Sequence, residues 1–156
     1  IYPDKEWAGS KGFKYVQLDK LFKDSDVLSL HCPLTEETKH IVNKQALSLM
    51  KKDAVIINTG RGALIDTQAL VYALKKRLIG GAALDVYEEE SKYFFDDWSV
   101  DVIRDDVLVR LMTFPNVIIT GHQAFLTTNA LEAIAETTLG NIKAFNSGAD
   151  LENEVK

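Results

Sequence analysis

The segment "AVIINTGRGALIDTQALVYALKKR" at residues 54–77 decides the fold class. It opens with a short and largely apolar run, 54–59, which is typical of a strand in a sheet that is covered on both faces. A turn with two glycines surrounds Arg61, and apolar residues then recur at spacings of three and four after Asp66, a suitable helix N-cap. A strand, a tight turn and an amphipathic helix in this order predict part of a crossover unit in a parallel sheet.

The same alternation recurs along the chain. Further strands are predicted at 26–32, 81–86 and 116–120, with 14–16 as a weaker edge candidate, and further helices at 18–24, 43–52, 105–112 and 127–148, the last ended by Gly148. Repeated strand and helix alternation predicts an α/β fold with a parallel sheet and right-handed crossovers, the doubly wound, Rossmann-like type.

Composition limits the possible partners. With 156 residues, 46% hydrophobic and 26% charged, the chain is long enough to bury one core. A formal net charge of −5 argues against a nucleic-acid or anionic membrane surface, because such partners need clustered lysine and arginine. One cysteine, Cys32, excludes an internal disulfide, and no apolar run approaches ~20 residues. We therefore expect a cytoplasmic protein.

Parallel sheets bind ligands at the carboxyl ends of their strands, so the residues just after each predicted strand are the candidates for a site. They are His31, Cys32 and Pro33; Thr59, Gly60 and Arg61; Asp85; and Gly121 with His122. A longer insert at 87–104 follows Asp85, and we expect its aromatic residues Tyr93, Phe94, Phe95 and Trp98 to form its local core.

Arg61 and His122 each allow two interpretations. The glycines beside Arg61 suit positive φ or the close approach of a ligand, and its guanidinium pairs either with a protein carboxylate or, bidentately, with a carboxylate or phosphate substrate. His122 is either a hydrogen-bonded structural residue or a proton donor. A carboxylate from the run Glu88, Glu89 and Glu90 beside His122 would favour proton transfer.

The remaining histidines do not indicate a metal site. His31, His40 and Cys32 lack close ligand pairs on one helical face and lack a cysteine pair, so no metal is predicted. Cys32 before Pro33 is better interpreted as a small buried residue near a ligand than as a nucleophile.

Three motifs carry a family resemblance. "VIINTGRGALIDTQAL" at 55–70, "GAALDVYEEE" at 81–90 and "VIITGHQAFLT" at 117–127 resemble consecutive signatures of the D-isomer-specific 2-hydroxyacid dehydrogenases, in the same order and spacing. The resemblance implies that Arg61 binds the carboxylate of a 2-oxo acid and polarises its carbonyl. It implies that His122 is the acid and base, and that Glu90 orients this imidazole and favours its charged form.

The resemblance also implies NAD as the cofactor, lined by Cys32, Pro33, Thr38, Thr59, Gly60 and Arg61, with Asp85 near the nicotinamide. The family's Gly-rich phosphate turn and its ribose-binding acidic residue would precede Ile1. We therefore expect the carboxyl-terminal part of such an enzyme, with 1–124 as a partial NAD-binding domain and 125–156 as the returning segment of the substrate domain. The intact enzyme is expected to be a homo-oligomer, a dimer.

The insert together with 120–127 most resembles family members that interconvert pyruvate and D-lactate in fermentation. That reaction is the expected function of the intact enzyme, and residues 1–156 are expected to be inactive alone. Two alternatives stay open: a dehydrogenase for a bulkier or phosphorylated D-2-hydroxy acid, and a binding protein that keeps the fold and senses NADH, like some transcriptional corepressors.

Overall fold

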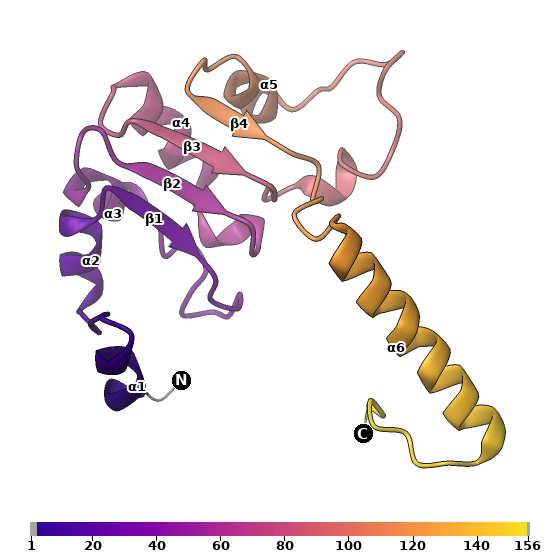
Figure 1. The fold of residues 1–156 in the computed structure, drawn as a ribbon. Helices are drawn as coiled ribbons and strands as arrows, with labels where there is room; N and C mark the ends of the chain where they lie inside the picture. The colour runs from indigo at the N-terminus through magenta and orange to yellow at the C-terminus, as the bar shows by residue number, and fades with distance from the viewer. Residues whose placement is uncertain (1–2, 156) are drawn as a thin grey trace. The chain divides into compact units, whose positions relative to one another are not determined.

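The computed structural model describes residues 3–155, and the chain divides into two compact units, 1–121 and 122–156. The first unit holds one four-stranded parallel sheet in the order β1-β2-β3-β4 (Figure 1). Its strands are β1 (Val27–Leu30), β2 (Val55–Asn58), β3 (Gly81–Leu84) and β4 (Val117–Ile119). All four lie within the predicted segments, and the predicted α/β fold with a parallel sheet is confirmed.

Apart from α1, the helices begin and end within three residues of their predicted bounds. They are α1 (Lys5–Ser10), α2 (Leu18–Asp24), α3 (Lys44–Leu49), α4 (Thr67–Lys75), α5 (Asp106–Met112) and α6 (Thr128–Ser147), with short 3₁₀ turns η1 (Gly62–Leu64) and η2 (Glu90–Lys92). Asp66 caps α4 by accepting a hydrogen bond from the Ala69 backbone N at 3.0 Å. Gly148 ends α6 in the left-handed conformation, at φ 69°.

Near the start of the chain one expectation is wrong and one helix was not predicted. Residues 14–16 form no strand: their side chains are exposed, and the sheet runs from β1 to β4 without them. Helix α1 was not predicted, although Asp4 caps it by accepting a hydrogen bond from the Trp7 backbone N at 2.8 Å. A helix of six residues is too short to show a clear apolar period.

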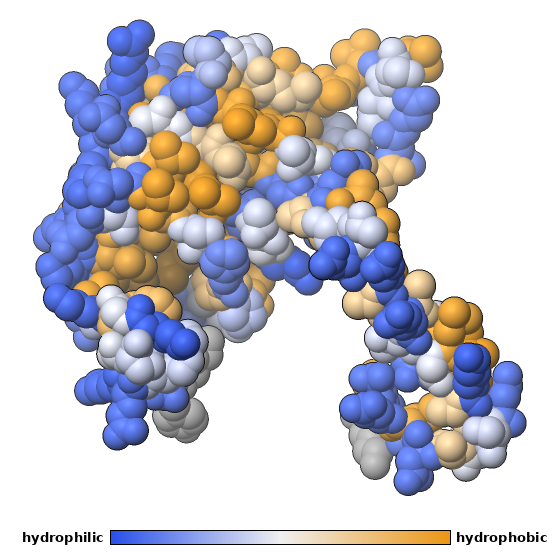
Figure 2. Space-filling view, in the orientation of Figure 1, coloured by the Kyte–Doolittle hydropathy of each residue, from blue (hydrophilic) through white to orange (hydrophobic). Residues whose placement is uncertain are grey.

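One face of the sheet carries the helices. Leu28, Ile56 and Ala82 share a row that is buried under the helical layer, whereas Val27 and Ile118 on the other face are 58% and 67% exposed. The expected cover on both faces is therefore not found in residues 3–155. Each connection leads to the next strand in the same direction across the sheet. Because crossover connections are right-handed, their helices then all lie on the same face of the sheet. Figure 2 shows hydrophobic residues gathered over the open face.

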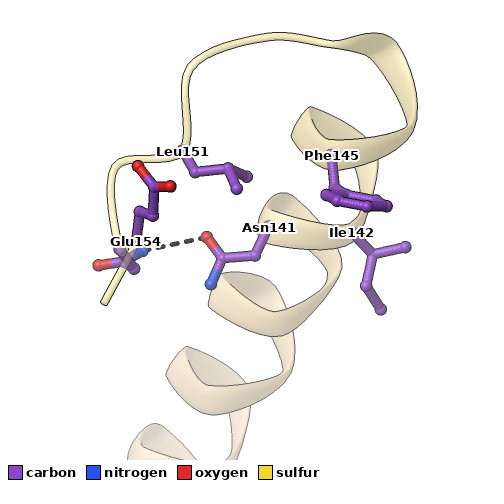
Figure 3. Close-up of a pocket in the computed structure, with 6 residues that line it drawn as sticks. Asn141, Ile142, Phe145, Leu151 and Glu154 are labelled. Carbon is purple, nitrogen blue, oxygen red and sulfur yellow. Dashed lines mark hydrogen bonds between the residues drawn. The ribbon is translucent and has the colours of Figure 1, made fainter. Parts of the chain in front are cut away.

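The second unit consists of residues 122–127, α6 and the tail after it. No side chain of α6 is buried in the described unit, and its apolar residues include Ile142 and Phe145. The tail turns back along the helix, where Asn153 Nδ2 donates to Asn141 Oδ1 at 3.1 Å beside a cavity of about 300 Å³ (Figure 3). This cavity contains none of the predicted site residues. Among the described helices, none is long and apolar enough to cross a membrane.

Gly62 is required by space and not by its backbone angles. Among the described glycines, positive φ occurs at Gly12 and Gly148, so the positive φ suggested for Gly60 and Gly62 is not found. A Cβ atom on Gly62 would lie 2.1 Å from the carbonyl carbon of Tyr87 and 2.4 Å from the Glu88 backbone N. Only glycine lets the turn after β2 pack directly on the backbone after β3.

Replacing Gly62 with alanine should therefore destabilise the first unit. Because its obstacle is backbone that cannot rotate away, we expect Gly62→Ala to lower the free energy of unfolding by about 2 kcal/mol or more. The matched control is Gly140→Ala in α6, where an added Cβ meets nothing within 4 Å. That substitution should stabilise the helix by up to ~1 kcal/mol. Urea unfolding of both variants measures the difference, and equal stability would contradict the packing argument.

Candidate active site

The four strands end in line. Their last residues are partners in the sheet register: Leu30, Asn58, Leu84 and Ile119. The segments that follow β1, β2 and β3 therefore begin side by side at one edge of the sheet. This edge brings together the predicted residues that follow these strands within the first unit: Cys32, Thr59, Gly60, Arg61 and Asp85.

A buried amide fixes the turn that carries Arg61. The Asn58 side chain is fully buried, and its Oδ1 accepts a hydrogen bond from the Gly60 backbone N at 3.0 Å. Its Nδ2 donates to the Arg61 carbonyl oxygen at 2.9 Å. The oxygen and the nitrogen of the buried Asn58 amide thus both find hydrogen-bond partners in the same turn. These two bonds fix the backbone of Arg61.

The Arg61 side chain is exposed, and its Nη1 donates to the Gly60 carbonyl oxygen at 2.9 Å. Throughout residues 3–155 its guanidinium forms no ion pair with a carboxylate. The interpretation of Arg61 as a turn arginine paired with a protein carboxylate therefore does not describe this structure. A rigid backbone and an exposed fork of donors suit the binding of an external anion.

The three consecutive glutamates have different surroundings. Glu88 Oε1 lies 2.7 Å from His40 Nε2, and Glu88 Oε2 accepts a hydrogen bond from Thr67 Oγ1 at 3.1 Å. Glu89 is exposed and pairs with Lys92. Glu90 is half-buried, and its Oε2 accepts a hydrogen bond from the Tyr87 backbone N at 3.0 Å. Glu88 and Glu89 thus each have a side-chain partner of their own, and the action of Glu90 on His122 stays a prediction.

Asp85 joins the ends of β3 and β4. It is 5% exposed and accepts a hydrogen bond from Thr120 Oγ1, while the Thr120 backbone N donates to the Leu84 carbonyl at 2.9 Å. The chain is thus fixed two residues before His122, the first residue of the second unit, which has a left-handed φ of 55°. The approach of His122 to Arg61 and Glu90 stays a prediction.

The loop after β1 closes on itself. Thr38 Oγ1 donates to the Pro33 carbonyl at 2.7 Å and accepts from the Thr35 backbone N at 2.7 Å, so Pro33 and Thr38 come together. Cys32 is half-buried against the core. Doubly wound sheets bind their ligands at the carboxyl ends of the strands, which is where these residues lie. In the described part of the chain no three His, Cys, Asp or Glu side chains gather as metal ligands.

Both ends of the insert at 87–104 are fastened to the core. Tyr87 is 5% exposed, and its hydroxyl donates to Asp105 Oδ2 at 2.8 Å. Asp105 Oδ1 caps α5 by accepting hydrogen bonds from two backbone N–H groups. Phe94 stacks on Tyr87 at 6.2 Å between ring centroids, so part of the predicted aromatic core is present, whereas Phe95 is exposed.

The Tyr87 hydroxyl gives stability a pH dependence. Burial is the main cause that raises the pKa of Tyr87 above its usual value, and the hydrogen bond to Asp105 raises it further. A raised pKa in the folded state stabilises the fold below pH ~10, and this contribution is lost as the pH rises above that value. We expect Tyr87→Phe to cost about 1 kcal/mol of unfolding free energy at pH 7.

Above pH ~10 the wild type should lose stability more steeply than Tyr87→Phe, because the variant has no buried phenol to ionise. Tyr72→Phe is the matched control, since Tyr72 is 45% exposed. Denaturation midpoints measured from pH 7 to pH ~11 separate the variants. Identical alkaline slopes for the wild type and Tyr87→Phe would contradict the coupling.

Sequence reasoning missed two features of this site. Asn58 is the polar end of an otherwise apolar strand, a signal that was present in the sequence. The contact of Glu88 with His40 and Thr67 joins residues 48 and 21 positions apart, and no local pattern indicates it. In the sequence, His40 stands out only as a possible metal ligand.

Comparison with known proteins gives the family. Residues 2–124 match the family described as "D-isomer specific 2-hydroxyacid dehydrogenase, NAD binding domain". The chain is 54% identical to "2-hydroxyacid dehydrogenase A" of Aspergillus oryzae over 88% of its own length and 41% of that protein. It is 52% identical to the D-lactate dehydrogenase of Escherichia coli, with coverage of 92% and 44%.

A solved structure agrees. The D-lactate dehydrogenase with NAD⁺ from Lactobacillus jensenii superposes with a TM-score of 0.88 at 33% identity, over 100% of this chain and 46% of that one. The chain thus spans less than half the length of the relatives that it matches. It belongs to the D-isomer-specific 2-hydroxyacid dehydrogenases, and most of it is their NAD-binding domain.

Proposed function

We propose that the full-length protein carrying this chain reduces a 2-oxo acid to the D-2-hydroxy acid, with pyruvate and D-lactate as the principal pair. The observation that carries the proposal is the Arg61 guanidinium, exposed beside the strand ends on a turn fixed by Asn58. The similarity to the D-lactate dehydrogenase of Escherichia coli supports the choice of substrate. Bound NADH would supply the hydride.

Each predicted residue has one task in this proposal. Arg61 holds the substrate carboxylate bidentately and draws electron density from the adjacent carbonyl. His122 gives its proton to the carbonyl oxygen as the alcohol forms, and takes it back in the reverse reaction. Glu90 stabilises the charged form of this imidazole.

The residues that line the cofactor are also proposed. Asp85 faces the nicotinamide end, and Cys32, Pro33, Thr38, Thr59 and Gly60 line the rest of the cofactor's reactive half. We further propose a boundary at residue 124 between the NAD-binding domain and the returning segment, a dimeric enzyme, and a cytoplasmic location. Light scattering of the full-length protein tests the dimer.

The substrate is tested directly by steady-state kinetics of the full-length protein on pyruvate, phenylpyruvate, glyoxylate and phosphohydroxypyruvate. The proposal requires the highest kcat/KM on pyruvate. A higher value on another acid would assign the protein to a different D-2-hydroxy acid. NADH binding with negligible turnover on all four would favour the alternative of an NADH-sensing binding protein.

Arg61→Lys tests the substrate arginine. Lysine keeps the charge but loses the planar pair of donors, so both KM for pyruvate and kcat should worsen. We expect kcat/KM to fall on the order of 100-fold, about 3 kcal/mol. Arg77→Lys, an exposed arginine at the other end of the sheet beside Gly80, is the matched control. An Arg61→Lys enzyme with nearly unchanged kcat/KM would remove Arg61 from the site.

Glu90→Gln tests the proton donor. Reduction needs His122 charged and oxidation needs it neutral, so the two directions should depend on pH in opposite ways. Loss of the Glu90 negative charge makes the protonated, charged form of the His122 imidazole less favourable. The alkaline limb of kcat/KM for pyruvate reduction should then move toward acid, and D-lactate oxidation should extend to lower pH.

The measurement is kcat/KM against pH in both directions, with a solvent isotope effect to show that proton transfer is exposed. Glu89→Gln is the matched control, because Glu89 is exposed and pairs with Lys92. Unmoved limbs in Glu90→Gln would show that Glu90 is not coupled to His122.

A further inference from the structure

We propose that Glu88 is a positioning residue that sets the spacing between Arg61 and Glu90, through a carboxylate shared by His40 and Thr67. This inference rests on the function proposed above. Glu88 itself would touch neither substrate nor cofactor. It acts by fixing the backbone from which the substrate arginine and the histidine's carboxylate partner both extend.

The segments that Glu88 joins already form a short parallel ladder. The His40 backbone N donates to the Ala63 carbonyl at 2.8 Å, and the Val42 backbone N donates to the Leu64 carbonyl at 3.1 Å. The Asp66 backbone N returns a bond to the Val42 carbonyl at 3.0 Å. Segment 40–42 therefore runs beside segment 63–66, which continues directly from Arg61 into α4.

The Glu88 carboxylate closes this ladder at both ends. One oxygen lies 2.7 Å from His40 Nε2 on the first segment, and the other accepts a hydrogen bond from Thr67 Oγ1 at the start of α4. Thr67 is buried, and His40 is held in a left-handed conformation at φ 52°. A non-glycine residue keeps such a conformation only where its surroundings determine it, at a cost of order 1–3 kcal/mol.

The same backbone supports both proposed reacting groups. Gly62, next to Arg61, packs on the Tyr87–Glu88 peptide so closely that no side chain fits between them. Glu90 Oε2 accepts its hydrogen bond from the Tyr87 backbone N at the other end of that residue. If this peptide moves, Gly62 loses its support and the Glu90 carboxylate moves with it, so the anchored Glu88 side chain controls both positions.

The contacts among Glu88, His40 and Thr67 are better suited to positioning nearby backbone than to raising the free energy of unfolding. The His40 and Glu88 side chains are 34% and 27% exposed, and a partly solvated pair of this kind contributes little to unfolding free energy. A displacement of ~1 Å at a reacting group, by contrast, can lower the rate on the order of 100-fold. Loss of Glu88 should therefore appear in catalysis before it appears in stability.

The test compares Glu88→Ala with Glu88→Gln in the full-length protein. Glutamine keeps an oxygen and an NH₂ group for His40 and Thr67, whereas alanine keeps neither. For Glu88→Ala we expect kcat/KM for pyruvate to fall about 30-fold, through both a higher KM and a lower kcat. Glu88→Gln should stay within about 3-fold of wild type. The Kd for NADH and Tm should change little in either variant, and Glu89→Ala is the control for loss of a neighbouring exposed carboxylate.

A double-mutant cycle adds a second criterion. If Glu88 acts through His40, the variant with both His40→Ala and Glu88→Ala should be no worse than Glu88→Ala alone. Additive losses, a failure of Glu88→Gln to rescue, or a fall in activity that parallels a fall in Tm would each overturn the positioning role.

Hydrogen exchange gives a readout that does not need turnover. In Glu88→Ala the amides of residues 60–64 should exchange faster than in wild type and in Glu88→Gln, while the amides of β1 and β2 stay protected. If the wild type reduces none of the 2-oxo acids, the proposed function fails and hydrogen exchange alone decides on Glu88. Unchanged exchange at 60–64 would then overturn the inference.

Discussion

The Cα of Gly62 rests directly on the Tyr87–Glu88 peptide, and the arrangement of the candidate site depends on this contact. A Cβ at position 62 would lie 2.1 Å from a backbone carbon, so the two segments pack as bare backbone. The register that places Asn58 beside Leu84 brings them to the same edge of the sheet. The backbone segments that carry Arg61 and Glu90 therefore meet at one close contact.

Hydrogen bonds of polar side chains around this contact fix the segments that form it. Asn58 holds the turn from beneath with both ends of its buried amide, and Asp85 ties the end of β3 to Thr120. Glu88 ties the outer side to His40 and Thr67. The helical layer packs against one face of the sheet and keeps the strand ends aligned. A few hydrogen bonds then fix the positions of the residues that follow the strands.

The charge distribution of the chain is consistent with an anion-binding role for Arg61. The chain carries a formal net charge of −5, so it does not attract an anionic substrate by its overall charge. In the proposed function the attraction must be local, and Arg61 would supply it from its exposed position, where it has no carboxylate partner in residues 3–155. The neighbouring acids Glu88 and Glu89 are each engaged with another side chain, which limits their competition for this guanidinium.

Local signals explain what could be predicted from the sequence. Apolar runs located all four strands, and the caps Asp66 and Gly148 marked helix ends, because these patterns depend on neighbours along the chain. Helix α1 was too short to show a period, and the weak apolar run at 14–16 that suggested a strand is exposed and lies outside the sheet. The glycines around Arg61 were recognised, but the reason for Gly62 was missed, because the Tyr87–Glu88 backbone is distant in sequence.

The same distinction holds for the site. Arg61 and His122 stood out by their positions after predicted strands, the family resemblance selected Glu90, and the strand ends explain why Arg61 and Asp85 share an edge. The different surroundings of the three glutamates could not be predicted, since they depend on contacts with His40, Thr67 and Lys92. Side-chain partners across a fold are set by packing, which a single sequence does not display.

A crystal structure of the full-length protein with NADH and oxamate, an unreactive analogue of pyruvate, would test the roles of Arg61 and Glu90 together. We expect two N–H groups of the Arg61 guanidinium to contact the oxamate carboxylate at about 2.8 Å, and a Glu90 oxygen to lie at a similar distance from the ring of His122. The Gly62 contact with the Tyr87–Glu88 peptide should be unchanged. An oxamate carboxylate bound by other residues, with Arg61 still folded onto the Gly60 carbonyl, would contradict the expected role of Arg61.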